Sequence, residues 1–235
     1  MKKVILIIGG TSGIGKGLAK IYAREGHQII ITGRNIEKAI SLSDSFPSQI
    51  TFYQHDISKN SSLEEIFQQH NKIDIAIVSA GISLINEAYS WEKENDMIQC
   101  NVNAVANIYH QLFGFFQKQS SGHLVGISSV AAVKGNRSQP AYSASKVFQR
   151  NYLQALRCKS VNEKLNIDIT DICPGFVETP INEGEKLFWA ASTEKACKQI
   201  YEAITKKNKQ AFITKRWALI YYIFKFLPNW VIEKM

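Results

Sequence analysis

Hydrophobic residues gather along the chain into short, β-branched runs that alternate with longer segments of helical spacing. Runs typical of buried strands cover residues 4–8, 28–32, 49–54, 73–79, 123–128, 166–173 and 211–214. Helical spacing covers residues 15–25, 36–46, 62–70, 95–119, 142–163 and 193–206. Strands that alternate with helices pair in parallel through right-handed crossovers, with helices on both faces. The pattern predicts an α/β fold, a doubly wound, mostly parallel sheet of about seven strands.

Local signals mark some of the element ends. The stretch from Ser62 to Glu65 has the Ser-x-x-Glu form of a capping box, so we expect it to open a helix that runs to about His70. Pro174 and Gly175 end the sixth strand.

No repeat, low-complexity tract or linker divides the 235 residues. Because α/β folds often reach about 250 residues as one unit, we expect a single domain over residues 1–235.

The apolar run after the basic start at residues 1–3 ends at Gly9, which predicts a buried strand rather than a leader. No run reaches the roughly 18 to 20 apolar residues that span a bilayer.

Cysteine and histidine patterns give no sign of a metal site or a disulfide framework. The four cysteines lie far apart without a C-x-x-C pair, and the five histidines lack an H-E-x-x-H spacing. We therefore expect no metal, and a reducing, cytoplasmic location.

A glycine-rich turn separates the first strand from the first helix. It reads GGTSGIG over residues 9–15, and its candidate contacts with a ligand are Gly9, Thr11, Ser12, Gly13, Ile14 and Gly15. Glycines let the backbone turn tightly and approach a pyrophosphate at the helix N-terminus. The spacing is Gly-x-x-x-Gly-x-Gly rather than the general Gly-x-Gly-x-x-Gly, and a tight turn without a ligand is the alternative.

The end of the second strand indicates which nucleotide the turn would bind. A dinucleotide fold that selects NAD usually has Asp or Glu there, whereas this chain has Arg34. A guanidinium offers charge-assisted hydrogen bonds to a 2′-phosphate, so Arg34 favours NADP(H) over NAD(H). A solvated surface arginine is the alternative.

Three residues are candidates for proton transfer. Tyr142 and Lys146 lie four apart on a predicted helix, where an ammonium lowers the pKa of a nearby phenol from about 10 toward the working range. Ser129, thirteen residues upstream, closes the fifth strand at the edge where ligands bind in doubly wound folds.

In this order along the chain, the glycine turn, Ser129, the Tyr142/Lys146 pair and Pro174-Gly175 resemble the short-chain dehydrogenase/reductase family, with its Rossmann-like fold, from about residue 4 to 211. The resemblance implies that Tyr142 donates the proton in carbonyl reduction, that Ser129 holds the substrate oxygen, and that Lys146 also binds the nicotinamide ribose. It implies that Asn101 holds a water in the proton relay, with Asn103 as the nearby competitor.

The resemblance also extends the cofactor site. Its further residues would be Asp56 near the adenine, Ala80 and Gly81 at the cofactor floor, and Pro174, Gly175, Val177 and Thr179 near the nicotinamide, besides Tyr142 and Lys146. A turn cap is the alternative for Asp56, since Asp is common after strands. Family members pair through two long helices, which implies a homodimer or homotetramer.

The sequence departs from the family pattern in three segments. Ile8 stands in place of a usual threonine, Val78 and Ser79 replace an Asn-Asn pair, and Ala104 replaces a common glycine. These changes concern hydrogen bonds of the sheet and cofactor floor, whereas every proton-transfer residue is present.

The C-terminal segment 215–235 is basic and aromatic. Nearly all of the chain's net charge of +8 comes from residues 195–235, and seven aromatic residues lie in 211–235. Pro228 should end the apolar helical stretch 217–227. The segment either packs on the protein, which we favour, or lies on an anionic membrane surface. No nucleic-acid-binding motif accompanies it, so we expect no nucleic acid partner.

These observations predict an oxidoreductase that transfers a hydride between NADPH and the carbonyl or secondary alcohol of an apolar ketone. The alternative is a catalytically silent NADP(H)-binding sensor or scaffold, which has no need for Ser129, Tyr142 and Lys146 together. We expect substrate specificity to come from residues 181–192, with Phe188 and Trp189, and from the C-terminal aromatics.

Overall fold

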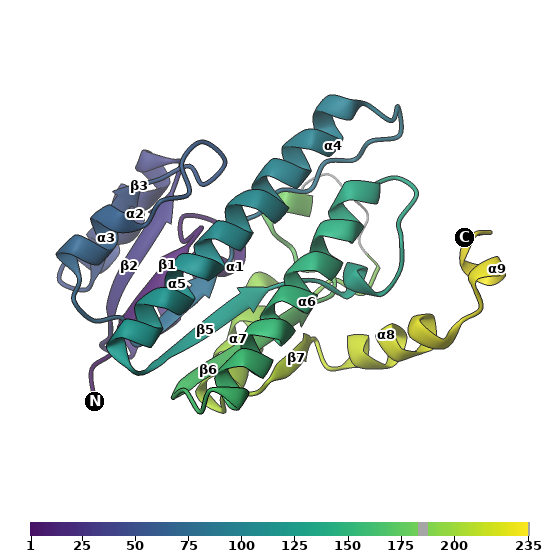
Figure 1. The fold of residues 1–235 in the computed structure, drawn as a ribbon. Coiled ribbons are helices and arrows are strands. Elements are labelled where there is room, and N and C mark those ends of the chain that lie inside the picture. The colour runs from purple at the N-terminus through teal and green to yellow at the C-terminus, as the bar shows by residue number, and fades with distance from the viewer. Residues whose placement is uncertain (183–187, 235) are drawn as a thin grey trace.

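A seven-stranded parallel sheet forms the centre of the computed structural model, which describes residues 1–182 and 188–234 (Figure 1). Its strands are β1 (Val4–Ile8), β2 (Gln28–Gly33), β3 (Ile50–Gln54), β4 (Ile75–Val78), β5 (Gly122–Ile127), β6 (Ile167–Pro174) and β7 (Gln210–Ile213). They lie in the order β3-β2-β1-β4-β5-β6-β7, and every neighbouring pair is parallel. The predicted α/β, doubly wound sheet is confirmed.

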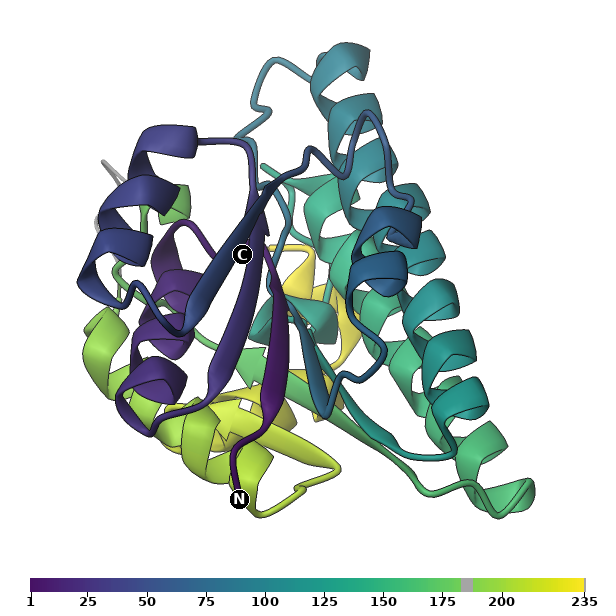
Figure 2. The ribbon, with the colours of Figure 1, turned by 90° about the vertical axis from the view of Figure 1, so that its left-hand side faces the viewer.

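Helices cover both faces of the sheet, as Figure 2 shows from the side. One face packs against α1 (Gly13–Arg24), α2 (Ile36–Ser45) and α7 (Thr193–Thr205); the other packs against α3 (Glu64–Gln69), α5 (Val105–Gln119) and α6 (Pro140–Asn162). Alternate residues of β1 divide between the two cores, because successive side chains of a strand point to opposite faces. Ile5 and Ile7 join the first core, and Leu6 and Ile8 the second.

The topology determines where a ligand can bind. The chain leaves β1 to build β2 and β3 on one side, then crosses to β4 on the other side, so Ile8 lies between Thr32 and Val78. Doubly wound sheets bind ligands outside the carboxyl ends of the strands at such a switch point.

The helix expected over residues 95–119 begins earlier and is not uniform. It consists of α4 (Trp91–Ile98), a π-helical stretch η1 (Gln99–Ala104) and α5. The wider turn carries Asn101, whose side chain is fully buried. Short π-helical insertions occur often at functional sites.

The predicted capping box at residues 62–65 is wrong. The helix α3 begins at Glu64, whose N–H donates to Ser62 Oγ at 3.3 Å. Leu63 is fully buried, and its N–H donates to Gln111 Oε1 on α5 at 2.8 Å. This anchoring to a neighbouring helix holds Leu63 outside the first helical turn.

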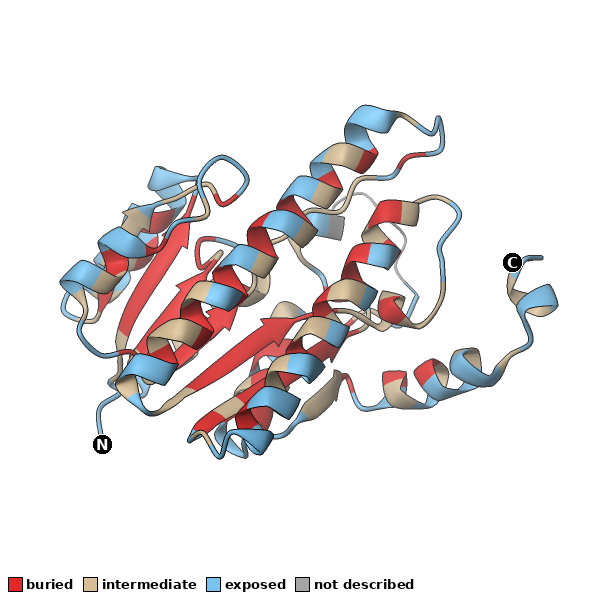
Figure 3. Cartoon of the chain, in the orientation of Figure 1, coloured by how far each residue is buried: buried red, intermediate tan, exposed pale blue. Residues whose placement is uncertain are grey.

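The C-terminal segment leaves the sheet edge after β7 and runs along the carboxyl side as α8 (Arg216–Phe226) and α9 (Asn229–Ile232). Two short 3-10 turns, η2 (Val130–Val133) and η3 (Pro180–Asn182), complete the described elements. Figure 3 shows buried residues concentrated in the sheet, whereas much of α8 and α9 is exposed. Within residues 1–182 and 188–234, no helix combines the length and the apolarity that crossing a membrane requires.

Candidate active site

A cavity of about 1740 Å³ follows the carboxyl edge of the sheet, from the segment after β3 to the C-terminal helices. Most of the residues that the sequence predicts for the site line it: Gly9, Thr11, Ser12, Gly13, Ile14, Arg34, Asp56, Ala80, Gly81, Ser129, Tyr142, Lys146, Pro174, Gly175, Val177 and Thr179. Gly15 and Asn101 lie behind this lining. Residues from six separate strand ends thus meet around one space.

The glycine turn lines the cavity beside the segments that follow β2 and β3. Gly9 has a left-handed φ of +84°, and a Cβ there would lie 2.8 Å from the backbone N of Ala80. A Cβ on Gly15 would lie 2.1 Å from the carbonyl O of Gly9, so this glycine allows close packing of the helix against the turn. Ser12 precedes α1 without capping it through its side chain. The first N–H groups of α1 are therefore free of a side-chain cap beside the cavity, as an anion site requires.

Positive side chains gather beside this turn. Arg34 follows β2, is exposed and lines the cavity, together with Lys38 and Lys59. Asn35 caps α2 by accepting from the Lys38 N–H at 2.8 Å, which holds the first turn of that helix at the cavity. Lys38 was not predicted from the sequence, although its position four residues after Arg34, at the start of a helix, could have indicated it.

Asp56 both caps a turn and lines the cavity. Its Oδ1 accepts from the N–H and the hydroxyl of Ser58, at 3.1 and 2.7 Å. Burial raises the pKa of Asp56, but the Ser58 hydrogen bonds and the charge of Arg34 outweigh this effect and hold the pKa below its usual value. The turn cap that the sequence left open is thus present, at the place where the family aspartate is expected.

Ser129, Tyr142 and Lys146 line the middle of the cavity. Ser129 precedes η2, and its Oγ accepts from the Ala131 N–H at 3.1 Å. Tyr142 and Lys146 lie on the first turns of α6, with the ammonium nitrogen 5.7 Å from the centre of the phenol ring. The expected i, i+4 pairing on one helix face is therefore present.

Lys146 is buried and held by two acceptors. Its Nζ donates to the Ile127 carbonyl O at 3.1 Å and to Gln149 Oε1 at 3.0 Å. Burial is the main cause that lowers the pKa of Lys146 to about 8. An ammonium that is fixed beside a phenol can stabilise the phenolate.

Asn101 braces the loop after β4. Its Oδ1 accepts from the Ile82 N–H at 2.8 Å, and its Nδ2 donates to the Ile82 carbonyl O at 2.7 Å. Its own carbonyl accepts from Gln149 Nε2 at 2.7 Å, so Gln149 links Asn101 to Lys146. A Cβ on Gly81 would lie 3.1 Å from Asn101 Oδ1 and 3.7 Å from Lys146 Nζ.

Gln149 was not among the site residues predicted from the sequence. It lies three residues after Lys146, on the same helix face, and is almost completely buried. Asn103, the competitor for the role of Asn101, donates to Gln99 Oε1 within its own helix instead.

The departures from the family pattern lie beneath the site. Ile8 and Val78 are buried partners on β1 and β4, where apolar packing replaces side-chain hydrogen bonds. Ser79 donates its N–H to the Ile8 carbonyl at 2.9 Å, which continues the sheet ladder. Ala104 is buried in the π-helical stretch.

The segment after β6 carries Gly175, Val177 and Thr179 along the cavity. Thr179 lies over the glycine turn, 3.4 Å from a Cβ built on Gly13. The indole of Trp217, from α8, covers Gly175, where a Cβ would lie 2.2 Å from Trp217 Nε1. Phe176 contacts the same indole edge to face, with ring centres 5.6 Å apart.

The C-terminal helices form the other end of the cavity. Trp217, Ile220, Tyr221 and Phe224 of α8 line it together with Asn229, Ile232 and Glu233. Lys134 Nζ donates to Asn229 Oδ1 at 3.1 Å, which joins the loop after β5 to α9. The expected packing of this segment on the protein is therefore present on one side of α8.

The predicted specificity region 181–192 is only partly described, since residues 183–187 lie outside the described residues. Ile181 lines the cavity. Phe188 and Trp189 do not line it; they stack on each other with ring centres 5.0 Å apart and are exposed.

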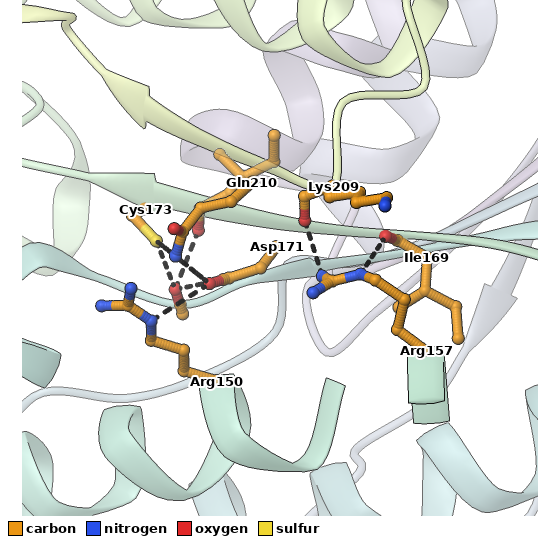
Figure 4. Close-up of polar contacts among 9 residues, drawn as sticks. Arg150, Arg157, Ile169, Asp171, Cys173, Lys209 and Gln210 are labelled. Atoms are coloured by element: carbon orange, nitrogen blue, oxygen red, sulfur yellow. Dashed lines mark hydrogen bonds and ion pairs between the residues drawn. The ribbon is translucent and has the colours of Figure 1, made fainter. Parts of the chain in front are cut away.

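A buried polar cluster supports the site from behind (Figure 4). Asp171 of β6 accepts from Ser128 Oγ at 2.5 Å, from Gln210 Nε2 at 3.0 Å and from Cys173 Sγ at 3.2 Å. Arg150 of α6 pairs with its carboxylate, with Nε 3.6 Å from Oδ2. Arg150 also stacks over the ring of Tyr221, 4.4 Å from its centre. The helix that carries Tyr142 and Lys146 is thus connected to β6 and to α8.

Further along α6, Arg157 donates to two backbone carbonyls at the sheet edge, those of Ile169 at 3.2 Å and Lys209 at 2.6 Å (Figure 4). Among residues 1–182 and 188–234, no three His, Cys, Asp or Glu side chains lie together as a metal site.

Comparison with known proteins identifies the class to which this fold and site belong. The family model described as short chain dehydrogenase matches residues 3–189. The chain belongs to the short-chain dehydrogenase/reductase family of oxidoreductases.

Individual relatives agree with this assignment. A 3-oxoacyl-(acyl-carrier-protein) reductase FabG of Chlamydia muridarum is 32% identical over 195 residues, which cover 78% of this chain and 77% of that protein. An uncharacterized oxidoreductase of Listeria monocytogenes, Lmo0432, is 31% identical over 191 residues, or 77% of each chain.

Solved structures share the fold. The structure of ElxO with NADP bound has a TM-score of 0.80 and 24% identity, and the match covers 93% of this chain and 99% of that one. A short-chain dehydrogenase/reductase of Burkholderia phymatum in complex with NAD has a TM-score of 0.84 and 17% identity, over 94% and 92% of the two chains.

Proposed function

We propose that this protein is an NADP(H)-dependent oxidoreductase that reduces the carbonyl group of an apolar ketone, or oxidises the corresponding secondary alcohol. The observation that carries the proposal is that Ser129, Tyr142 and Lys146 line one cavity, between the glycine turn with Arg34 and the apolar wall of α8. A silent nucleotide-binding protein has no need for these three side chains around one space.

The residues at the glycine turn fit a dinucleotide. The uncapped start of α1 suits the pyrophosphate, and Arg34 with Lys38 suits a 2′-phosphate. A relative in fold, ElxO, was solved with NADP, which supports the same cofactor here, although another neighbour was solved with NAD. A bound nicotinamide cofactor would supply the hydride.

The chain's own residues would handle the substrate oxygen and its proton. Ser129 would donate a hydrogen bond to the carbonyl oxygen, and Tyr142 would give its phenolic proton to that oxygen as the carbonyl carbon receives the hydride. Lys146, held by Ile127 and Gln149, would stabilise the phenolate that remains. Asn101 would act through Gln149 to hold Lys146 in place.

The apolar side chains at the far end of the cavity favour an apolar substrate. Val130, Val133, Trp217, Ile220 and Phe224 line this end, opposite the glycine turn. A ketone with a hydrocarbon body would bury apolar surface there while its carbonyl lies near Tyr142. The homodimer or homotetramer and the cytoplasmic location expected from the sequence stay predictions.

Calorimetric titration with NADPH and with NADH, followed by NADPH oxidation with a panel of aromatic and long-chain ketones, tests the proposal. We expect NADPH to bind at least about tenfold more tightly than NADH. Tyr142→Phe should lower turnover by about 100-fold or more and leave the Kd for NADPH within about threefold. The matched control Tyr152→Phe makes the same chemical change on the same helix and should keep normal turnover.

Three outcomes would count against the proposal. Failure of both nucleotides to bind would contradict the enzyme assignment. Tight NADPH binding without turnover of any ketone would favour the silent sensor or scaffold. Retention of more than about a hundredth of the activity in Tyr142→Phe would remove Tyr142 as the proton donor.

A further inference from the structure

The helix α8 has two apolar sides, and only one of them meets the protein. Trp217 and Tyr221 are buried, and Ile220 and Phe224 face the cavity. On the opposite side, Leu219, Tyr222, Ile223 and Phe226 are exposed, and Phe226 has 79% of its surface in contact with solvent. These four residues follow the i, i+3, i+4, i+7 spacing of one helix face.

This outer side continues into neighbouring segments. Trp230 of α9 is 63% exposed. Arg216, at the start of α8, stacks over the ring of Trp189, 5.0 Å from its centre, and donates to the Trp189 carbonyl. Trp189 in turn stacks on Phe188. We name the exposed residues Phe188, Trp189, Leu219, Tyr222, Ile223, Phe226 and Trp230 the outer patch.

The charges between positions 215 and 234, which carry α8 and α9, are almost all positive. Lys215, Arg216, Lys225 and Lys234 are exposed, and Glu233 is the one acidic residue between positions 215 and 234. A second copy of the chain that paired symmetrically through this patch would bring these cations against their own counterparts. An anionic lipid surface attracts them and accepts the apolar side chains between them.

We propose that the outer patch docks α8 and α9 onto an anionic membrane surface. The aromatic rings of Tyr222 and Trp230 suit the interface between head groups and acyl chains, and the basic side chains reach the head groups. Because α8 has only eleven residues, it lies on the surface and does not cross it. The docking itself does not depend on catalysis.

This docking gives the cavity a source of apolar ligands. The inner side of α8 lines the cavity. A lipophilic molecule dissolved in the bilayer would therefore be separated from the cavity by the width of one helix. This consequence rests on the proposed function, whereas the membrane contact stands without it.

Flotation of the full chain with vesicles tests the docking. Vesicles of phosphatidylcholine alone are compared with vesicles that contain a quarter phosphatidylglycerol, at low and at high salt. We expect about tenfold more protein on the anionic vesicles, and a clear reduction at high salt. The double variant Leu219→Glu/Phe226→Glu should lose this binding.

A matched control places the same charges elsewhere. Ile40→Glu/Val161→Glu alters two exposed apolar residues on α2 and α6, which are 52% and 67% exposed, and should bind vesicles like the unaltered protein. A second variant, Lys215→Glu/Lys225→Glu, reverses two cations without touching the apolar side chains and should also lose binding. Far-UV circular dichroism shows that each variant is folded, and titration with NADPH separates failure of docking from failure of the proposed function.

Three results would overturn the proposal: no binding to either vesicle, equal binding to both, or equal loss in the variant and its control. A dimer in analytical ultracentrifugation that disappears in Leu219→Glu/Phe226→Glu would assign the outer patch to self-association instead.

Discussion

The two ends of the cavity are built in different ways. At the cofactor end, the backbone forms the surface. Because Gly9 and Gly15 have no Cβ, β1, α1 and the loop after β4 pack closely against one another. The start of α1 has no side-chain cap. At the C-terminal end, large side chains of α8 form the cavity surface, and Trp217 covers Gly175 from outside the sheet.

This difference bears on what each end can recognise. A backbone surface with N–H groups at a helix start presents the same donors whatever the surrounding side chains, which suits a constant anionic group. A wall of side chains on a helix at the sheet edge can change shape or composition without disturbing the strands. We therefore expect substitutions at the two ends to separate cofactor binding from substrate binding.

The largest effect should come from filling the close approach at the cofactor end. In Gly15→Ala the new Cβ would lie 2.1 Å from the Gly9 carbonyl, where only backbone movement can relieve the clash. We expect NADPH binding to weaken by about 100-fold and the free energy of unfolding to fall by about 3 kcal/mol. Calorimetry measures the affinity for NADPH, and urea denaturation measures the free energy of unfolding.

Gly114→Ala is the matched control, because a Cβ there meets nothing within 4 Å on α5. It should keep NADPH binding and gain about 0.5 to 1 kcal/mol of stability, as alanine favours a helix interior over glycine. Similar behaviour of the two variants would contradict the close packing that we assign to Gly15.

The pH dependence of stability should identify the buried ammonium between the two ends. Burial lowers the pKa of Lys146 to about 8, below its value in the unfolded chain of about 10.4. Between these values the unfolded chain binds more protons, so stability rises with pH. From pH 8 to pH 10 the native protein should gain about 2 kcal/mol relative to Lys146→Met.

Urea denaturation at both pH values measures this difference, and titrating groups remote from Lys146 cancel in the comparison. Lys159→Met, an exposed change on the same helix, should follow the native protein at both pH values. Parallel curves for the native protein and Lys146→Met would show that Lys146 has no lowered pKa.

Removal of the indole at the other end should weaken substrate binding while the binding of NADPH stays nearly unchanged. In Trp217→Ala the apolar wall opens beside Gly175, and we expect KM for a long-chain ketone to rise about ten- to thirtyfold, with Kd for NADPH within about threefold. Trp91→Ala, an exposed tryptophan on α4, should alter neither value. A larger loss in NADPH binding than in KM would show that the two ends are not separate.

The smallest effect should come from Arg34→Asp, since Arg34 is exposed and Lys38 also lines the site. Preference for NADPH over NADH should fall by about tenfold, because a guanidinium is replaced by a carboxylate that repels a 2′-phosphate. Steady-state kinetics with both nucleotides measure it. Arg24→Asp, the same charge change at the end of α1, should leave the preference unaltered, and an equal shift in both variants would remove Arg34 from the phosphate site.

The sequence predicted the elements best where the spacing of apolar residues depends on a single strand or a single helix. All seven strands and the pairing of Tyr142 with Lys146 follow from local periodicity, because buried strands and helix faces each impose their own spacing on apolar residues. The capping box at Ser62 failed because a contact with Gln111, forty-eight residues away, holds Leu63 outside the helix. Local spacing has no information about such a partner.

The site residues show the same distinction between local spacing and contacts with distant parts of the chain. The glycines, Arg34, Ser129, Tyr142 and Lys146 stand at strand ends or on one helix face, where a parallel sheet must bring them to one edge. Gln149 was missed because its importance lies in bridging the Asn101 carbonyl and Lys146, two groups on different helices. The π-helical turn at Asn101 was missed for the same reason, since its bonds are made to Ile82 of another loop.

By itself, the sequence determined the parallel sheet, the turn at residues 9–15 and the order of the catalytic candidates, because these depend on spacing along the chain. Only the tertiary structure decided which side of α8 faces the cavity, since Trp217 to Phe226 is apolar all round apart from Lys225. A helix that is apolar on every side has no preferred face until a neighbour covers one. Gly175, which leaves room for the indole of Trp217, and Arg150, which stacks on Tyr221, make that choice.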